Sequence, residues 1–383
     1  MPLTVADNPF AFLESIADPR LNRSKQHKLV DILVIALCGF LAGGEGWVDV
    51  ELFGLSKRNW LEKFLELPNG IPSHDTFGRV FALLDPQQLA RMLRKFVQTV
   101  TGSLAGEEET GALHGEGVAI DGKTLRRSGE ATTGKEALHL VSAWATQHGV
   151  VLGQVATADH SNEITAIPVL LQLLDVRGAT VTIDAMGCQK EIARQVREQE
   201  ADYVLAVKGN QKRLEEIVHL KLGPGRPTAP RSTLQTSEKN HGRTEQRTYV
   251  AMAAPKAIRR HWPDAQSIVR VGRETTDEHG KKTQEVRYFI SSLAPEVNRL
   301  ASLIRGHWGI ENRLHWSLDV TFNEDQSRIR QGHAAENAAL LRRLTLSILK
   351  QDTRYADSLR CKRLRAAWEN TALEHFLTIF AGN

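Results

Sequence analysis

Two aspartates in this chain of 383 residues each end a short apolar segment. Asp121 closes the segment Val-Ala-Ile-Asp (118–121), and Asp184 closes Val-Thr-Ile-Asp (181–184). A carboxylate at the end of a buried strand costs free energy unless its charge is compensated, and a divalent cation can supply that compensation. The alternative is structural: each aspartate caps the turn that follows it. Both interpretations stay open for these two residues.

A third acid, Glu311, lies in a segment that is rich in His, Trp, Asn and Arg. His307, Glu311 and His315 are spaced four residues apart, which predicts one shared helix face that could bind zinc. Metalloprotease helices place Glu beside the first of two histidines, and this segment does not. Two aspartates and one glutamate suit Mg²⁺ or Mn²⁺ better, because hard cations prefer oxygen ligands. Two such ions about 3.5–4 Å apart activate a water or a 3′-hydroxyl for attack at phosphorus.

The elements that must position these acids follow from the apolar pattern. Residues 10–100 are expected to be helical, and the composition then changes to Gly, Glu and Thr up to Gly117. Strands are expected at 118–121, 138–144, 150–156, 180–184 and 203–207, with helices at 163–174 and 189–199. Further strands are expected at 244–251, 267–273 and 284–291, then a long helix from Pro295 past Glu311 and another at 334–350. The pattern predicts an α/β layer with a mixed sheet.

Charge and composition narrow the class of protein. Apolar residues make up 41% and charged residues 25%, and the longest apolar run is shorter than the ~20 residues of a membrane span. Membrane, secreted and fibrous classes are therefore excluded, and three scattered cysteines favour a reducing compartment. The net charge is +4, yet residues 208–260 carry a basic excess of eight and residues 326–365 an excess of seven. These blocks favour a surface for nucleic acid, although solvated helix faces are the alternative.

Several long sequence words resemble the insertion-sequence DDE transposases, in the branch of the H-repeat-associated proteins. The resemblance covers nearly the whole chain, and the words occur in the order of the family. They are Leu-Pro-Asn-Gly-Ile-Pro-Ser-His-Asp-Thr-Phe-Gly-Arg-Val (67–80), Ile-Asp-Gly-Lys-Thr (120–124), Asn-Glu-Ile (162–164), Thr-Ile-Asp-Ala-Met-Gly (182–187), Tyr-Val-Leu-Ala-Val-Lys-Gly-Asn-Gln (203–211), His-Gly-Arg (241–243) and His-Trp-Gly-Ile-Glu-Asn (307–312).

The resemblance implies an α/β fold of the RNase H-like type, with a mixed sheet flanked by helices and an all-helical N-terminal domain. It divides the chain into a transposase-associated domain at 1–110 and a catalytic domain at 111–383. The catalytic domain would carry a β-rich insertion at about 223–293 and a helical tail. Asp121, Asp184 and Glu311 would be the catalytic residues and would bind two ions of Mg²⁺ or Mn²⁺. The N-terminal domain would recognise DNA ends or serve structure and dimerisation.

The wider superfamily often has Tyr, Arg and Lys at fixed spacing around the third acid, where this chain has Ile304, His307 and Leu318. Arg305, His307, Arg313 or a later cation are the candidate substitutes. Lys208 starts a strand-to-helix junction where backbone amides and its ammonium can meet a phosphate. The full set of expected DNA contacts is Lys123, Lys208, Asn210, His241, Arg243, Arg305, His307, Asn312, Arg328 and Arg330. Trp308 is expected in the core, with stacking on a displaced base as the alternative.

The predicted function is a metal-dependent transposase that cleaves transposon ends and joins the 3′-hydroxyl to target DNA. Its partners would be double-stranded DNA and a second copy of the chain on that DNA, in the bacterial cytoplasm and nucleoid, without a membrane. The alternatives are a metal-dependent nuclease without strand transfer, a domesticated DNA-binding relative without catalysis, and a zinc hydrolase. Amide substitutions of the three acids distinguish the catalytic from the non-catalytic alternatives.

Overall fold

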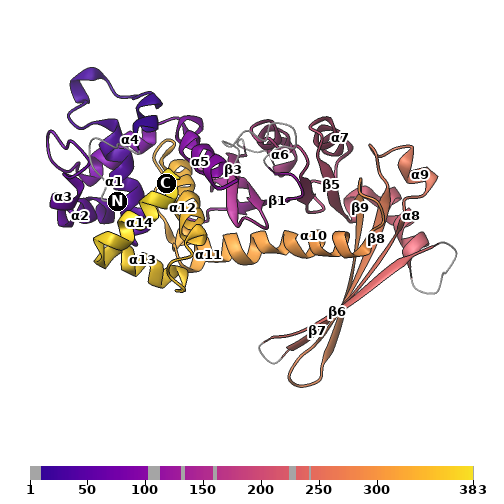
Figure 1. Ribbon diagram of the computed structural model, residues 1–383. Coiled ribbons are helices and arrows are strands. Elements are labelled where there is room, and N and C mark those ends of the chain that lie inside the picture. Colours follow the sequence, from indigo (N-terminus) through magenta and orange to yellow (C-terminus); the bar gives the residue numbers. More distant parts are fainter. Residues whose placement is uncertain are drawn as a thin grey trace.

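The computed structural model describes residues 10–101, 113–130, 134–157, 162–223, 230–240 and 243–382. Its central feature is one nine-stranded sheet in the order β3-β2-β1-β4-β5-β9-β8-β7-β6. Helices cover both faces of the first five strands, and a large helical region adjoins the end that holds β3 (Figure 1). The fold is therefore mixed α/β, as the sequence predicts.

The first half of the sheet consists of the five strands predicted around the acids. They are β1 (Gly117–Thr124), β2 (His139–Ala145), β3 (Val150–Ala156), β4 (Thr180–Ile183) and β5 (Asp202–Val207). The first three are antiparallel neighbours, whereas β4 and β5 run parallel to β1. Helices α6 (Glu163–Gln172) and α7 (Lys190–Glu198) pack on one face. Helix α10 (Val297–Gly309) contacts β1 and β4 and crosses the other face (Figure 1).

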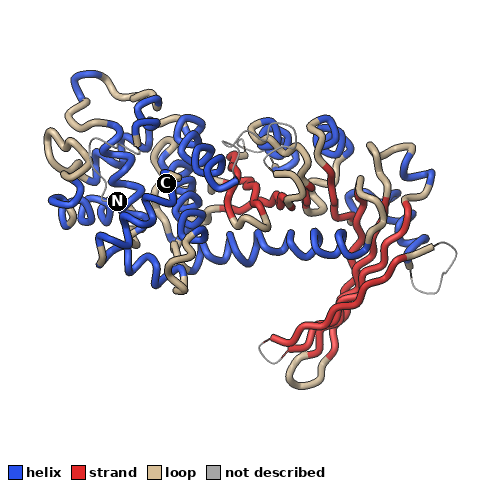
Figure 2. The backbone as a smooth tube through the Cα atoms, in the orientation of Figure 1, coloured by secondary structure: helices blue, strands red, loops and turns tan. Residues whose placement is uncertain are grey.

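The second half of the sheet is formed by residues 232–291 and projects from the body as a twisted arm (Figure 2). Its strands are β6 (Ser232–Asn240), β7 (Arg243–Ala253), β8 (Ser267–Thr276) and β9 (Lys282–Ser291), with α8 (Lys212–Leu222) and α9 (Lys256–Arg259) at its base. All four strands are antiparallel, and β9 pairs with β5, so the arm continues the core sheet. Strand β6 was not predicted, because its sequence has a single large apolar residue, Leu234, and no apolar alternation.

The described part of residues 10–101 contains helices and no strand. Ser73 caps α4 (His74–Leu83) by accepting a hydrogen bond from the Thr76 amide at 3.4 Å, and Pro86 occupies the first position of α5 (Pro86–Thr101). These helices pack in one apolar cluster with the C-terminal helices. The N-terminal elements are η2 (Ala11–Ser15), η3 (Asn22–Ser24), α1 (Leu29–Leu41), α2 (Trp47–Ser56), α3 (Arg58–Leu61), α4 (His74–Leu83) and α5 (Pro86–Thr101); the C-terminal ones are α12 (Ala334–Gln351), α13 (Leu359–Trp368) and α14 (Asn370–Ala381).

The second basic block, residues 326–365, places only part of its positive charge on the surface. Arg342, Arg343, Lys362 and Arg363 are all buried on α12 and α13. Arg363 donates to the backbone carbonyls of Phe40 and Gly44. These four cations join α12 and α13 to the loops and carboxylates that surround them, whereas other cations of the block, such as Arg328, are exposed.

Helix α10 continues without a break into a π-helical segment, η6 (Ile310–His315), and then into α11 (Trp316–Val320). The long helix predicted from Pro295 past Glu311 is therefore present, but the wider turn within it was not predicted. π-Helical turns are rare and often occur at functional sites. In the described residues, no helix is long and apolar enough to cross a bilayer.

Candidate active site at the edge of the sheet

The two aspartates lie at the same edge of the sheet because β1 and β4 are parallel neighbours. Ile120 is paired with Ile183, so the residue after each of them, Asp121 and Asp184, stands at matching height. Buried Val118 and Val181 anchor the two strands in the core. The strand pairing thus brings together two acids that are 63 positions apart in the sequence.

Asp184 uses one carboxylate oxygen to hold the turn that follows β4. Its Oδ1 accepts hydrogen bonds from the amides of Met186 at 3.0 Å and Gly187 at 3.4 Å. The structural role that the sequence left open is therefore present. Burial and the negative charge of Glu163 nevertheless raise the pKa of Asp184 above its ordinary value.

Asp121 lies within a more strongly acidic surrounding. Burial, followed by repulsion from Glu163 and, more weakly, from Asp184 and Glu311, raises its pKa to about 7. The group nearest to it that could be cationic is His315, whose Nδ1 lies 3.6 Å from Asp121 Oδ2. Burial, aided by the charge of Arg343, lowers the pKa of His315 to about 3, so its imidazole is neutral. Among the residues that the structure describes, Asp121 therefore has a polar neighbour but no compensating charge.

Glu163, in the first turn of α6, is a site residue that sequence reasoning missed. It contributes the largest charge repulsion on both aspartates. Its Oε1 lies 2.9 Å from His139 Nε2. Asn162 caps α6 by accepting a hydrogen bond from the Ile164 amide at 3.0 Å. This cap fixes the start of the helix at Glu163. The Asn-Glu-Ile word was visible in the sequence, but its position beside β1 is a property of the fold.

Glu311 lies in the π-helical segment and is exposed. The wider turn overturns the prediction that His307, Glu311 and His315 share one face. His307 pairs with Thr182, His315 lies against Asp121, and Glu311 lines a pocket toward the arm. Within the described ranges, no three His, Cys, Asp or Glu side chains are gathered closely enough to hold a metal ion between them. The acids share one edge of the sheet without closing a three-ligand site.

Lys123 is not positioned as the predicted DNA contact. Its Nζ lies 2.7 Å from Asp319 Oδ1 and 2.8 Å from Asp325 Oδ1, and its side chain is 8% exposed. It also lies 3.6 Å from Glu324, which pairs with Arg343 at 2.9 Å; the side chains of that pair are fully buried. Because three carboxylates surround the ammonium of Lys123 beneath the surface, the DNA contact predicted for it is wrong. We call Lys123, Asp319, Glu324, Asp325 and Arg343 the buried ion cluster.

His307 is likewise used inside the protein. Its Nδ1 lies 2.9 Å from Thr182 Oγ1, which joins α10 to β4. Burial lowers the pKa of His307 to about 4, so the ring is neutral and offers no charge to a phosphate. Its placement corrects the expectation of a DNA contact and of a substitute for the arginine of the wider superfamily.

Lys208 and Asn210 follow β5, next to the aspartates. Lys208 is exposed, and its charge counteracts the rise in the pKa of Asp184. Asn210 Nδ2 donates to the Ala185 carbonyl at 2.6 Å and so holds the turn after Asp184. The exposed ammonium of Lys208 can therefore contact a phosphate near the acids. The side-chain amide of Asn210 instead donates its hydrogen bond within the protein.

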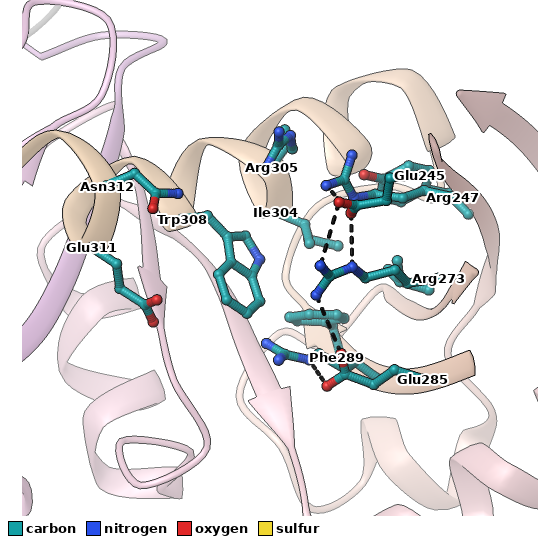
Figure 3. Close-up of a pocket in the computed structure, with 13 residues that line it drawn as sticks. Glu245, Arg247, Arg273, Glu285, Phe289, Ile304, Arg305, Trp308, Glu311 and Asn312 are labelled. Atoms are coloured by element: carbon teal, nitrogen blue, oxygen red, sulfur yellow. Dashed lines mark hydrogen bonds and ion pairs between the residues drawn. The ribbon is translucent and has the colours of Figure 1, made fainter. Parts of the chain in front are cut away.

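A pocket of about 320 Å³ separates the acidic edge from the arm. Glu311 and Asn312 lie on one side of Trp308, and Arg247 and Arg273 lie on the other (Figure 3). The Arg287 guanidinium stacks 4.1 Å from the centre of the Trp308 ring. Trp308 therefore lines this pocket and is only half-buried, which differs from the expected core position. Arg305 also lines the pocket and pairs with Glu238 at 2.9 Å.

The remaining expected DNA contacts are spread over the molecule. Arg243 is exposed at the start of β7, and His241 lies outside the described residues. Arg328 is exposed beside the helical region, and Arg330 donates to the Arg127 carbonyl at 2.9 Å and pairs with Glu130 at 3.1 Å. Arg328 and Arg330 line a second hollow together with Lys135 and Trp47. The structure does not gather these cations with Lys208.

Comparison with known proteins identifies the family. The family model described as "Transposase DDE domain" matches residues 113–369, and the model of its associated domain matches residues 10–97. The H repeat-associated putative transposase YhhI of Escherichia coli K12 is 38% identical over 94% of this chain and 95% of its own length. The putative transposase YncI of Escherichia coli O157:H7 is 37% identical over 96% of this chain and 93% of its own.

A solved structure, the piggyBac transposase synaptic complex with hairpin DNA, aligns with a TM-score of 0.40 and 11% identity over 98% of this chain and 76% of its own. That likeness is too weak to carry an argument. The match to the DDE family model covers the strands, the two aspartates and the helix of Glu311. The chain therefore belongs to the DDE transposases of insertion sequences, in the branch of the H repeat-associated proteins.

Proposed function

We propose that this transposase cleaves transposon ends by metal-dependent phosphoryl transfer and joins the freed 3′-hydroxyl to target DNA. The observation that supports the proposal is the uncompensated negative charge at one edge of the sheet. Asp121 and Asp184 stand side by side with Glu163, and in the described residues neither aspartate pairs with a lysine or arginine within 4 Å. Such a group of acids is unfavourable for folding unless the site holds a cation.

The residues at this edge fit hard divalent cations by their chemistry. The donors are carboxylate oxygens, and the two imidazoles beside them, His315 and His139, each adjoin a single acid. Asp121, Asp184 and Glu311 would hold Mg²⁺ or Mn²⁺, in one or two ions. When bound, such ions lower the pKa of an attacking hydroxyl and stabilise the negative charge on the leaving oxygen. Holding them requires the carboxylates to lie closer together than they do in the structure.

The protein's own groups supply orientation and phosphate binding. Neutral His315 stands against Asp121 Oδ2, and the Met186 and Gly187 amides orient the Asp184 carboxylate. Lys208, beside Asp184, is placed to hold a DNA phosphate at the mouth of the site. Arg328 and Arg243 would hold DNA farther from the cut. The DNA is proposed to be double-stranded and bound by a dimer, in the bacterial nucleoid.

The strand order also supports the finer assignment of the fold. Three antiparallel strands, then a helix and two strands parallel to the first, are the arrangement that the RNase H-like assignment requires. We keep the division into a helical associated domain at 1–110 and a catalytic domain at 111–383 as part of the proposal. The helices of the first part share an apolar cluster with the C-terminal helices, so we expect neither part to fold without the other.

The test is an assay on a supercoiled plasmid that carries labelled element ends. With Mg²⁺, the wild-type chain should nick the ends and form joined products. Asp184→Asn should lower cleavage at least about 1000-fold, because loss of one ion ligand removes several kcal/mol of transition-state stabilisation. DNA binding, followed by gel shift, should be retained.

Other outcomes separate the alternatives. Cleavage without joined products would identify a nuclease without strand transfer. Unchanged activity in amide variants of Asp121, Asp184 and Glu311 would leave a DNA-binding protein without catalysis and contradict the proposal. Glu191→Gln on the exposed surface of α7 is the matched control and should cleave as the wild type does.

A further inference from the structure

A cavity of about 600 Å³ lies where the N-terminal helices meet the rest of the chain, and we call it the junction hollow. Trp47 of α2 and Gly78 of α4 form one side of it. The connection from β1 to β2 and the segment before α12 form the other side. Three of the four charged residues that the structure describes in this lining are cations. They are Lys135, Arg328 and Arg330, and the acid is Glu130.

Contacts between distant segments give the junction hollow fixed walls. The Arg330 guanidinium donates from Nε to the Arg127 carbonyl at 2.9 Å and pairs through Nη1 with Glu130 at 3.1 Å. The His333 amide donates to the Ala82 carbonyl at 3.1 Å, which ties the segment before α12 to α4. A cavity that exists before its ligand arrives loses less conformational entropy on binding, so the junction hollow is suited to a ligand.

Arg328 and Lys135 are cations of the junction hollow whose charge the protein does not balance. Both are exposed, and in the part of the chain that the structure describes neither forms an ion pair with a carboxylate. Lys135 Nζ donates to the Arg330 carbonyl, which leaves two of its three N–H groups for a ligand. Ala334 also lines the hollow as the first residue of α12, so the positive end of this 18-residue helix adds to the field.

The junction hollow lies at the same edge of the sheet as the acids. The connection that lines it begins at the end of β1, the strand that carries Asp121. Arg127, which contacts Arg330, follows Asp121 by six positions, so at most about 20 Å of chain separates the two residues. One turn of B-DNA spans about 34 Å and 10 base pairs. A duplex whose cleaved phosphate lies at the acids can therefore place another phosphate in the hollow within one turn.

We propose that the junction hollow binds a backbone phosphate of the duplex that this transposase cleaves, less than one helical turn from the cleaved bond. The inference rests on the proposed function, since the duplex is the substrate of that reaction. Arg328 and Lys135 contact the phosphate oxygens, whereas Arg330 stays with Glu130 and supports the wall. The N-terminal helices thereby form part of the DNA-binding surface, because Trp47 bounds the same cavity. Phosphate contacts of this kind set the position of DNA without reading its sequence.

The decisive experiment measures binding of a labelled duplex of about 30 base pairs, or three helical turns, that carries an element end. The full chain is titrated in chelator by fluorescence anisotropy at several salt concentrations, so the result does not depend on a metal ion. Each phosphate contact contributes about 0.9 to the slope of log K against log salt. Arg328→Ala should lower this slope by about one unit, and the double variant with Lys135→Ala should lower it by about two.

Two control variants separate a phosphate contact from other effects. Arg328→Lys keeps the positive charge and should retain most of the wild-type slope. Arg177→Ala removes an exposed arginine that precedes β4 and so lies at the opposite edge of the sheet from Asp184; it should leave the slope unchanged. All of the substituted side chains are exposed, so the melting temperatures should match that of the wild type and exclude unfolding as the cause.

Ethylation of individual phosphates locates the contact on the duplex. With the wild type, a modified phosphate within about 10 base pairs of the cleaved bond should weaken binding. With Arg328→Ala, modification of that phosphate should have no further effect, while the other interfering positions should remain. An interference pattern that is identical in the two proteins would overturn the inference, because the hollow would then hold no DNA phosphate.

The failure of this inference is distinct from the failure of the proposed function. An unchanged slope in Arg328→Ala and in the double variant, together with Mg²⁺-dependent cleavage by the wild type, would overturn the role of the junction hollow and leave the reaction standing. A lowered slope in both variants without cleavage by the wild type would support the DNA contact and contradict the proposed reaction.

Discussion

Strand β1 contributes one residue to each of two groups of charged side chains. The two groups differ in how their charge is balanced. Asp121 and Lys123 lie two positions apart on β1, so their side chains point to the same face. Lys123 enters the buried ion cluster, where Asp319, Glu324 and Asp325 lie close to Lys123 or Arg343. Asp121 instead meets Glu163, Asp184 and Glu311, with neutral His315 beside it.

The difference separates structural charge from functional charge. A buried pair such as Glu324–Arg343 offsets its desolvation by mutual attraction and hydrogen bonds, and it contributes little net stability beyond fixing the geometry. Like charges gathered at an accessible edge only raise the free energy of the folded chain. They persist where a ligand of opposite charge supplies the balance, and strongly shifted carboxylates are accordingly frequent at active sites.

The largest expected effect is the loss of a partner in the buried ion cluster. Arg343→Met removes the cation nearest to the buried Glu324 carboxylate, leaves Lys123 at 3.6 Å, and should lower the free energy of unfolding by about 3–5 kcal/mol. Urea denaturation followed by circular dichroism measures this value. The double variant with Glu324→Gln should recover part of the loss, and a double variant as unstable as the single one would contradict the pairing.

The next largest change in the free energy of unfolding is expected for Lys123→Met, with Lys208→Met as the comparison. Lys123→Met should destabilise the protein by about 2–4 kcal/mol, because it leaves Asp319, Glu324 and Asp325 with one cation fewer. Lys208→Met should leave the unfolding curve unchanged within about 0.5 kcal/mol, because the side chain is exposed.

For DNA affinity, the larger effect is expected for Lys208→Met and the smaller one for Lys123→Met. Lys208→Met should weaken binding and reduce the dependence of log K on log salt by about one unit, as the loss of one phosphate contact would. The folded fraction of Lys123→Met should keep the wild-type salt dependence. A larger loss of DNA affinity in Lys123→Met than in Lys208→Met would contradict the placement of both side chains.

Removal of a charge from the acidic edge should stabilise the metal-free protein. The pKa of Asp121 is raised from 3.8 to about 7 in the folded chain, so the folded state binds the proton more tightly than the unfolded state. The contribution of Asp121 to stability is therefore most favourable below about pH 4, falls as the pH rises, and is least favourable above pH 7.

Asp121→Asn should accordingly raise the free energy of unfolding in chelator by about 1–3 kcal/mol at pH 8, with no gain at pH 4. Thermal denaturation at the two pH values measures the difference. Added Mn²⁺ should stabilise the wild type and not the variant. Destabilisation of the variant at pH 8 would show that the acidic edge is balanced within the protein.

The smallest effect is expected at an ordinary surface pair. Arg58 and Glu62 lie 2.8 Å apart on exposed helix positions, and Arg58→Ala should change the free energy of unfolding by about 0.5 kcal/mol or less. The same denaturation assay gives a baseline for the other variants. A cost comparable to that of Arg343→Met would remove the distinction between surface and buried pairs.

The sequence predicted the strands best where apolar residues are continuous. The segments around Val118 and Val181 are buried on both faces of the sheet, so their composition alone indicates a strand. Strand β6 has no such pattern and is held by its pairing with β7. The same limit applies to cations, because Lys123 and Arg343 look like surface charge in the sequence, and their burial depends on carboxylates from distant elements.

The sequence by itself determined the residues available for chemistry and the order in which they appear: two aspartates at strand ends, an acid on a later helix, and the words that place the chain in its family. Only the tertiary structure decided that Glu163 stands beside the aspartates, that a π-helical turn separates His307, Glu311 and His315, and that Lys123 is enclosed. The physical reason is that apolar periodicity is a local property of the chain. Charge compensation depends on contacts between elements far apart in the sequence.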